Sequence, residues 1–200
     1  MSKPIGKGAL VALAAVGLAV ATIGWRMFDG TAAEAGAGRH GAFERLTAAA
    51  AADPADAAGW QRLGKAFFDA GRFADAARAY DRATTAEPDD PASWSSLGEA
   101  LAMSSANRRL PPAAFAAFRK TSALDPQDWR ARYYLAVKRD IDGDHPGAID
   151  DWLALLAETP AGTPREAELQ RTIEQVSQLH GIAVGDRMAA AIASRPAAQP

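Results

Sequence analysis

The sequence predicts an all-α protein built from a helix pair that repeats along the chain, and three observations carry this prediction. Apolar residues in 60–83 recur every three or four positions in two short runs, which is the spacing of one helix face. Gly71 separates the two runs and Pro88 follows the second, as expected at the turn and the end of a pair. The unit also recurs at a constant spacing. The pairs that share this spacing are Trp60 with Trp94, Pro54 with Pro88, and Pro126 with Pro160.

The order of large, small and aromatic residues within each pair matches the tetratricopeptide (TPR) pattern, and the shared spacing equals its period of about 34 residues. Gly64 and Ala76 are expected where the two helices approach closely, because a larger side chain would push them apart. A single pair cannot bury its apolar face, so neighbouring pairs must stack into a solenoid. The interval from Pro88 to Pro126 is longer than this period, which indicates an insertion of four residues in the second repeat. We place this insertion within 104–112, between the two helices of that repeat.

The spacings divide the chain into an anchor, a linker, the repeat domain and a tail. The expected segments are an N-terminal membrane anchor at 1–28, a flexible linker at 29–39, the TPR domain at 40–183 and a flexible tail at 184–200. Within the domain the expected units are a half repeat at 40–56, repeats at 57–90, 91–128 and 129–162, and a closing helix at 163–181. The closing helix is expected because a solenoid needs a cover for its last apolar face.

Several residues have the chemistry of helix ends. Asp56 is a predicted N-cap for the helix that carries Trp60. Thr163 followed by Glu166 three residues later is a start signal for the closing helix, and Gly181 is its stop. The tail after Gly181 has one weak helical pattern around Met188, so we expect it to be flexible.

The N-terminal segment 8–25 is an uncharged run whose length is close to the lower limit of the roughly 17–25 residues that a membrane-spanning helix needs. Lys3 and Lys7 precede it and only Arg26 follows directly, which favours a cytoplasmic N-terminus. The protein would then be a single-pass protein of the bacterial inner membrane, with its repeats in the periplasm. The alternative is a cleaved signal peptide, because 19–21 resembles an A-x-A cleavage site.

Composition limits the chemistry that this chain can perform. The absence of cysteine excludes disulfides, thiolate catalysis, thiolate metal sites and covalent haem attachment to the chain itself. A net charge of −2 predicts no attraction to nucleic acid. Neither the nucleophile-elbow motif nor the phosphate-loop motif occurs. We therefore predict that the protein is not an enzyme and has no cofactor.

The three histidines, His40, His145 and His180, have no metal-ligand spacing, so we expect surface or helix-end positions and no metal site. The stretch 140–144 is similar to the start of a calcium loop. However, His145 stands where that loop needs glycine and Asp151 where it needs glutamate, so calcium is not expected.

The five tryptophans are predicted to lie in the membrane belt or in the repeat core. The exception is Trp129, at the first position of the third repeat, which the TPR pattern leaves free. Two interpretations stay open for it: a cap on the helix junction, or an exposed contact for a partner.

The first helices of the pairs are expected to line a concave face that binds a partner. The predicted lining residues are Gln61, Lys65, Phe68 and Asp69 in the first repeat, Ser95, Glu99 and Met103 in the second, and Tyr133, Val137, Asp140 and Ile141 in the third. This set lacks the rows of Lys and Arg that clamp a C-terminal carboxylate. The lining mixes apolar and polar groups with little net charge. Aromatic and aliphatic residues with a few carboxylates suit an amphipathic helix with basic residues on its rim.

Two stretches, 53–64 and 142–156, together with the insertion and the closing helix, resemble the periplasmic TPR domain of the c-type cytochrome biogenesis family CcmI/CycH and the similar NrfG subunit. The resemblance covers roughly 40–181. It implies a membrane-anchored chaperone that holds apocytochrome c, chiefly its C-terminal helix, for the subunits of the haem-ligation complex. Long members of the family have two membrane helices with a cytoplasmic loop, whereas this chain has one predicted span. The alternative is a generic anchored TPR scaffold in another cell-envelope complex.

Overall fold

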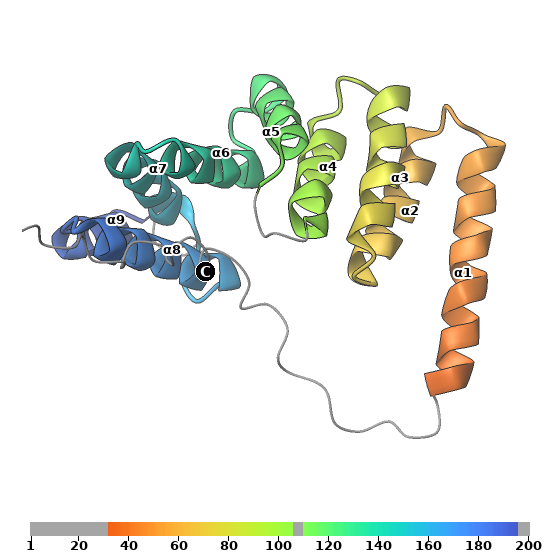
Figure 1. The fold of residues 1–200 in the computed structure, drawn as a ribbon, viewed down its shortest axis with the longest axis horizontal. Coiled ribbons are helices and arrows are strands. Elements are labelled where there is room, and N and C mark those ends of the chain that lie inside the picture. Colours follow the sequence, from red (N-terminus) through yellow and green to blue (C-terminus); the bar gives the residue numbers. More distant parts are fainter. Residues whose placement is uncertain (1–31, 106–109, 196–200) are drawn as a thin grey trace, which may run out of the picture.

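The structure is a computed structural model that describes residues 32–105 and 110–195, with side chains from residue 41 onward. Within these residues the chain forms nine α-helices and no strand (Figure 1). The helices are α1 (Ala32–Ala52), α2 (Ala57–Asp69), α3 (Phe73–Ala86), α4 (Pro91–Ser104), α5 (Pro112–Leu124), α6 (Trp129–Ile141), α7 (His145–Glu158), α8 (Pro164–His180) and α9 (Gly185–Ala193).

The helices stack in chain order as an open array, which confirms the predicted all-α repeat fold. Three pairs, α2 with α3, α4 with α5 and α6 with α7, pack internally and against their neighbours. In Figure 1, α1 stands at one end of the array, and α8 and α9 lie at the other. The axes of α1 to α5 stand upright in that view while α6 to α9 lie across it, so the array turns between the second and third repeats.

The turns inside the pairs follow the predicted pattern. Gly71 and Gly143 have φ values of 72° and 96°, a left-handed backbone that glycine adopts without steric cost. The second repeat has no such turn, because α4 ends at Ser104 and α5 begins at Pro112. The four extra residues therefore fall within the predicted range.

The shared spacing of tryptophan and proline has a physical cause. Trp60 Nε1 donates a hydrogen bond to the carbonyl oxygen of Pro54 at 3.2 Å, and Trp94 Nε1 donates to that of Pro88 at 2.8 Å. Each indole thus ties the first helix of a repeat to the turn that precedes it. The two residue types keep the same period because they form one contact.

Small residues permit close contact between the helices of each pair. A Cβ atom on Gly64 would lie 2.8 Å from the ring of Tyr80, and one on Gly98 would lie 2.7 Å from the ring of Phe118. Both distances are shorter than non-bonded carbon atoms tolerate. The prediction that Gly64 lies at a helix contact is confirmed, and Gly98 has the same role in the second repeat.

The N-terminal side differs from the prediction in two respects. Helix α1 begins at Ala32, so residues 32–39 of the predicted flexible linker are helical. Alanine favours helix strongly enough to outweigh the two glycines at 36 and 38. Asp56 precedes α2, but its side chain makes no capping hydrogen bond and instead accepts from Arg62 at 3.2 Å.

The C-terminal side shows both a confirmed and a wrong expectation. Thr163 Oγ1 accepts from the backbone N–H of Glu166 at 3.3 Å, and Gly181 ends α8 with a φ of 67°. The predicted flexible tail at 184–200 is wrong over α9, which packs on α7. Arg195 fixes the end of this segment, donating to the carbonyl oxygen of Leu156 at 3.0 Å and to Glu166 at 2.6 Å.

No helix in 32–105 or 110–195 is sufficiently long and apolar to traverse a lipid bilayer. The predicted anchor at 8–25 lies outside the described residues, as does the end of the chain at 196–200.

Candidate peptide-binding surface

One position of the predicted lining connects each repeat to the next. Gln61 Nε2 donates to Asp90 Oδ2 and to Ser93 Oγ, both at 2.8 Å. Asp90 is also the N-cap of α4, where it accepts from the backbone N–H groups of Ala92 and Ser93. The amide of Gln61 is therefore engaged by the second repeat.

The equivalent residue of the second repeat behaves in the same way. Ser95 is fully buried and its Oγ donates to Asp128 Oδ1 at 3.1 Å. Asp128 is the N-cap of α6 and accepts from the backbone N–H of Ala131 at 2.8 Å. An aspartate cap that also binds the preceding repeat thus occurs at both repeat junctions.

Tyr133 stands at the equivalent position of the third repeat, but the structure gives it a different role from the one predicted. It is 5% exposed, and its hydroxyl forms a hydrogen bond of 3.2 Å with Thr172 Oγ1 of the closing helix. Burial raises the pKa of Tyr133 to about 12. Tyr133 is a core residue between the third repeat and α8, so its ring is not a free aromatic anchor on the concave face.

Acidic residues lie partly buried around this junction. Glu99 Oε2 pairs with Arg130 Nε at 2.9 Å, and the two side chains are 28% and 37% exposed. Burial raises the pKa of Glu99, and it raises the pKa of Glu168 on α8 as well. The prediction included Glu99 but missed Arg130 and Glu168. Arg130 is the second residue of the third repeat, and its side chain faces α4 of the second repeat, where it pairs with Glu99.

The first repeat contributes an exposed charged pair and an aromatic ring. Lys65 Nζ pairs with Asp69 Oδ2 at 2.7 Å, and both side chains are exposed. The ring of Phe68 meets Phe73 edge-on, with 5.1 Å between centroids, and is half-buried. Met103 in the second repeat is also half-buried.

The remaining three predicted residues all belong to the third repeat, and each lies in a different environment. Val137 packs partly buried against the core of α6 to α9, and Ile141 is 59% exposed. Asp140 faces His145, with 2.7 Å between Oδ1 and Nδ1. The structure therefore places these three residues on one helix without bringing them to one contact point.

Trp129 caps the junction between α6 and the closing helix, which decides between its two interpretations. Its ring stacks on Tyr133 with 5.2 Å between centroids, and the guanidinium of Arg165 lies 5.2 Å from its centroid. Its buried Nε1 makes no hydrogen bond to the described part of the protein.

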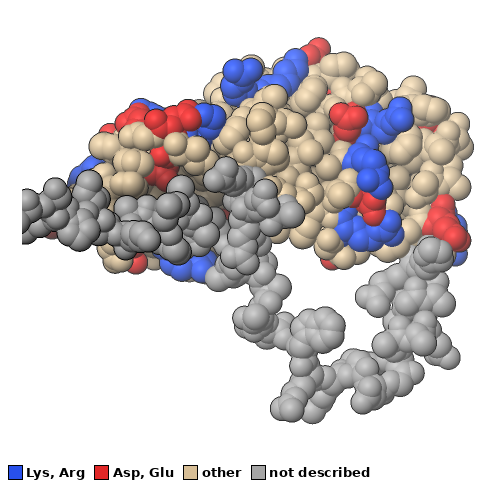
Figure 2. Space-filling view, viewed as in Figure 1, with Lys and Arg blue, Asp and Glu red and all other residues tan. Residues whose placement is uncertain are grey.

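A hollow of about 810 Å³ lies between α3, α4 and α5. Its floor is mostly alanine and leucine with Trp94, and its charged residues are Arg78, Asp81 and Lys120. In Figure 2 charged side chains gather over α3, at the upper edge over α5, and over α6 and α7, and the surface between these groups is mostly uncharged.

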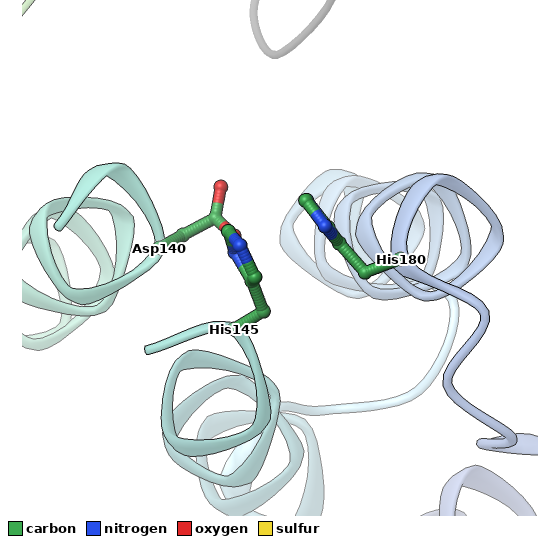
Figure 3. Close-up of side chains that lie close together, drawn as sticks. All are labelled: Asp140, His145 and His180. Atoms are coloured by element: carbon green, nitrogen blue, oxygen red, sulfur yellow. The ribbon is translucent and has the colours of Figure 1, made fainter. Parts of the chain in front are cut away.

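A cluster of two histidines and a carboxylate was missed by sequence reasoning. His145 begins α7 and His180 ends α8, so the predicted helix-end positions are correct. Their rings nevertheless stack with centroids 3.4 Å apart, beside Asp140 at the end of α6 (Figure 3). The two histidines are far apart in sequence, so no local spacing could have indicated this contact.

Comparison with solved structures places the architecture among TPR-like folds. Two crystal structures of MamA are similar, each with a TM-score of 0.60 and 20% sequence identity. The similarity covers 84% of this chain and 94% of the first MamA chain, and 80% and 82% for the second.

Sequence comparison finds relatives with a stated role. Cytochrome c-type biogenesis protein CycH of Rhizobium meliloti is 36% identical over 114 residues, which is 57% of this chain and 30% of that protein. CycH of Bradyrhizobium diazoefficiens is 31% identical over 124 residues, which is 62% of this chain and 33% of that protein. The match thus spans about a third of the length of these relatives. The family described as "Cytochrome c-type biogenesis protein H TPR domain" matches residues 46–166, more than half of the chain. The chain therefore belongs to the TPR-domain family of cytochrome c-type biogenesis protein H.

Proposed function

We propose that this protein is a membrane-anchored periplasmic adaptor that binds the C-terminal helix of apocytochrome c and presents it to the haem-ligation complex. Family membership supports a role in cytochrome c maturation. The structural observation that carries the binding role is the pair of partly buried carboxylates, Glu99 and Glu168, at the junction of the second repeat, the third repeat and α8.

These carboxylates favour a basic ligand. Burial raises the pKa of both groups because desolvation disfavours the charged form. Arg130 and Arg165 offset part of this cost for Glu99, and Arg165 also lies near Glu168. A lysine or arginine from a bound helix would add an opposite charge in a partly desolvated place, where it contributes more than on an open surface.

Three apolar side chains of the predicted lining suit the other face of such a helix. Phe68 and Met103 are half-buried, and Ile141 is exposed to solvent. An amphipathic helix in a groove buries its apolar face on such groups and places its charges at the rim. A generic scaffold for another envelope complex is the alternative, and the binding experiment below distinguishes the two.

The first prediction concerns ligand binding. In the full chain, Phe68→Ala combined with Glu99→Gln should weaken binding of an apocytochrome c C-terminal peptide by about 2 kcal/mol, the loss typical of a hot spot. Isothermal titration calorimetry measures the affinity, and circular dichroism should stay unchanged. The matched control is Phe115→Ala with Glu87→Gln, which makes the same substitutions on the outer helix α5 and at the end of α3.

The pH dependence of peptide binding tests the same prediction in a second way. Because the pKa values of Glu99 and Glu168 are raised, both groups lose their charge at a higher pH than an exposed glutamate. Binding of a basic helix should therefore be strongest at neutral pH and weaken as the pH falls through these raised values. Glu99→Gln should flatten this profile. Wild-type protein that binds no such peptide, or equal losses in the outer-helix control, would favour the generic scaffold.

The second prediction concerns the anchor. We expect residues 8–25, an uncharged run with flanking lysines, to hold the protein in the inner membrane. The mature protein must then retain them, because a cleaved segment cannot anchor it. Mass spectrometry of protein purified from membranes should then detect peptides from this segment. A mature N-terminus at Thr22 would instead establish cleavage after Ala21.

A further inference from the structure

Three helix ends meet at the cluster of Asp140, His145 and His180. Figure 3 shows Asp140 coming from α6, His145 from the start of α7 and His180 from the end of α8. One potential ligand atom from each residue lies within 4.8 Å of the other two. The cluster is thus assembled from three separate helices at the surface of the C-terminal half.

The carboxylate in this cluster differs from its acidic neighbours in what it faces. Asp142 pairs with Lys138, and Asp144 and Asp151 both pair with Arg139. Asp140, in contrast, forms its ion-pair contact with His145, at 2.7 Å. The side chain of Asp140 is also the more sheltered of the two, at 17% exposed against 28% for His145.

The donor set has a defined metal preference. Two imidazoles and one carboxylate suit Zn²⁺, Ni²⁺ and Cu²⁺, whereas Mg²⁺ and Ca²⁺ prefer oxygen ligands alone. Three protein ligands leave room for water in the remaining coordination positions.

The cluster can hold an ion after two adjustments, a wider contact between Asp140 and His145 and a rotation of the His180 ring. At bond lengths of about 2.0–2.2 Å, ligand atoms around a tetrahedral ion lie about 3.4 Å apart. Oδ1 of Asp140 and Nδ1 of His145 are 2.7 Å apart, so an ion that replaces the proton between them opens this contact slightly. The imidazoles stack with 14° between their planes, and His180 is exposed, so its ring is free to turn toward the ion.

We propose that Asp140, His145 and His180 form a binding site for a single divalent cation of the Zn²⁺ class. The bound ion cross-links the end of α6, the start of α7 and the end of α8. It therefore fastens the closing helix to the third repeat at the point where α8 has its last turn. The proposal rests on the contacts of Asp140, His145 and His180 and does not depend on the proposed function, although Asp140 also belongs to the predicted lining.

The test is isothermal titration calorimetry on the full chain after treatment with a chelator. The wild-type chain should bind one Zn²⁺ or Ni²⁺ per molecule and should show no saturable heat with Mg²⁺ or Ca²⁺. Binding of Zn²⁺ should raise the unfolding midpoint, because an ion that binds only the folded state stabilises it. Hydrogen exchange near the end of α8 should slow in the same samples.

Single substitutions then assign the ligands. His180→Ala, His145→Ala and Asp140→Asn should each weaken Zn²⁺ binding about tenfold or more, and His40→Ala is the matched control that should leave it unchanged. His180 is exposed, so its variant should fold normally, and circular dichroism verifies this. Wild-type protein without saturable Zn²⁺ binding, or a His40→Ala loss equal to that of His180→Ala, would overturn the proposal.

Discussion

Replacing Trp152 with alanine should lower the free energy of unfolding by about 3–5 kcal/mol, the usual cost of removing a buried large aromatic side chain. Trp152 is 0% exposed and is the largest fully buried side chain among the described residues. It packs in the core shared by α6, α7 and α8, and its Nε1 donates to the carbonyl oxygen of Tyr133 at 3.3 Å. The substitution therefore removes both packing and a buried hydrogen-bond donor. Urea unfolding monitored by circular dichroism measures the change.

Trp152→Phe separates these two contributions. Phenylalanine keeps much of the ring volume but leaves the Tyr133 carbonyl oxygen without its indole partner. Its cost should be clearly smaller than that of alanine, since much of the apolar contact remains. Equal losses for the two variants would assign the stability to the hydrogen bond. A loss below about 1 kcal/mol for alanine would contradict the central position of Trp152, because cavities in a packed core cost more than this.

The repeat fold could be predicted because its signals are local and repeated. Apolar spacing and glycine in the turns arise within one repeat, and the indole–carbonyl contacts of Trp60 and Trp94 join residues that are only six positions apart. Once one repeat is recognised, its period predicts the others, and it also indicates where the second repeat departs from the pattern. Each interior position then follows from its place in the period.

The binding surface was harder to predict because it depends on contacts between repeats. Gln61, Ser95 and Tyr133 stand at the same position of successive repeats, a position that was expected to line the concave face. Each nevertheless bonds to the following helical layer, at a distance in sequence of 29 to 39 residues. Periodicity predicts the face on which a side chain lies, but it does not show which residue of the next repeat that side chain contacts.

The C-terminal end of the array and the histidine cluster show the same limit. The sequence around Met188 has only a weak helical pattern, yet α9 forms because α7 offers it an apolar surface and Arg195 bonds to Leu156 and Glu166. His145 and His180 meet because the ends of α7 and α8 meet. These features arise from tertiary packing, which overrides local preference.

Gly64→Leu should destabilise the first repeat by about 1–3 kcal/mol or more, because it overpacks a close helix contact. A Cβ atom alone would lie 2.8 Å from the ring of Tyr80, so a whole leucine side chain cannot fit without moving α2 from α3. Tyr80 is itself buried in the core of the first two repeats, so its ring has little room to retreat. Thermal unfolding should show a midpoint lower by several degrees.

Gly41→Leu is the matched control, because no atom lies within 4 Å of the Cβ position at Gly41 in α1. Leucine favours helix over glycine by up to about 1 kcal/mol, so this variant should be neutral or slightly stabilising. Both substitutions replace a glycine within a helix by leucine, and they differ in the space around the new side chain. If Gly64→Leu left the midpoint unchanged, the close approach of Gly64 to Tyr80 could not be a property of the folded protein, and the tight pairing of α2 and α3 would have to be abandoned.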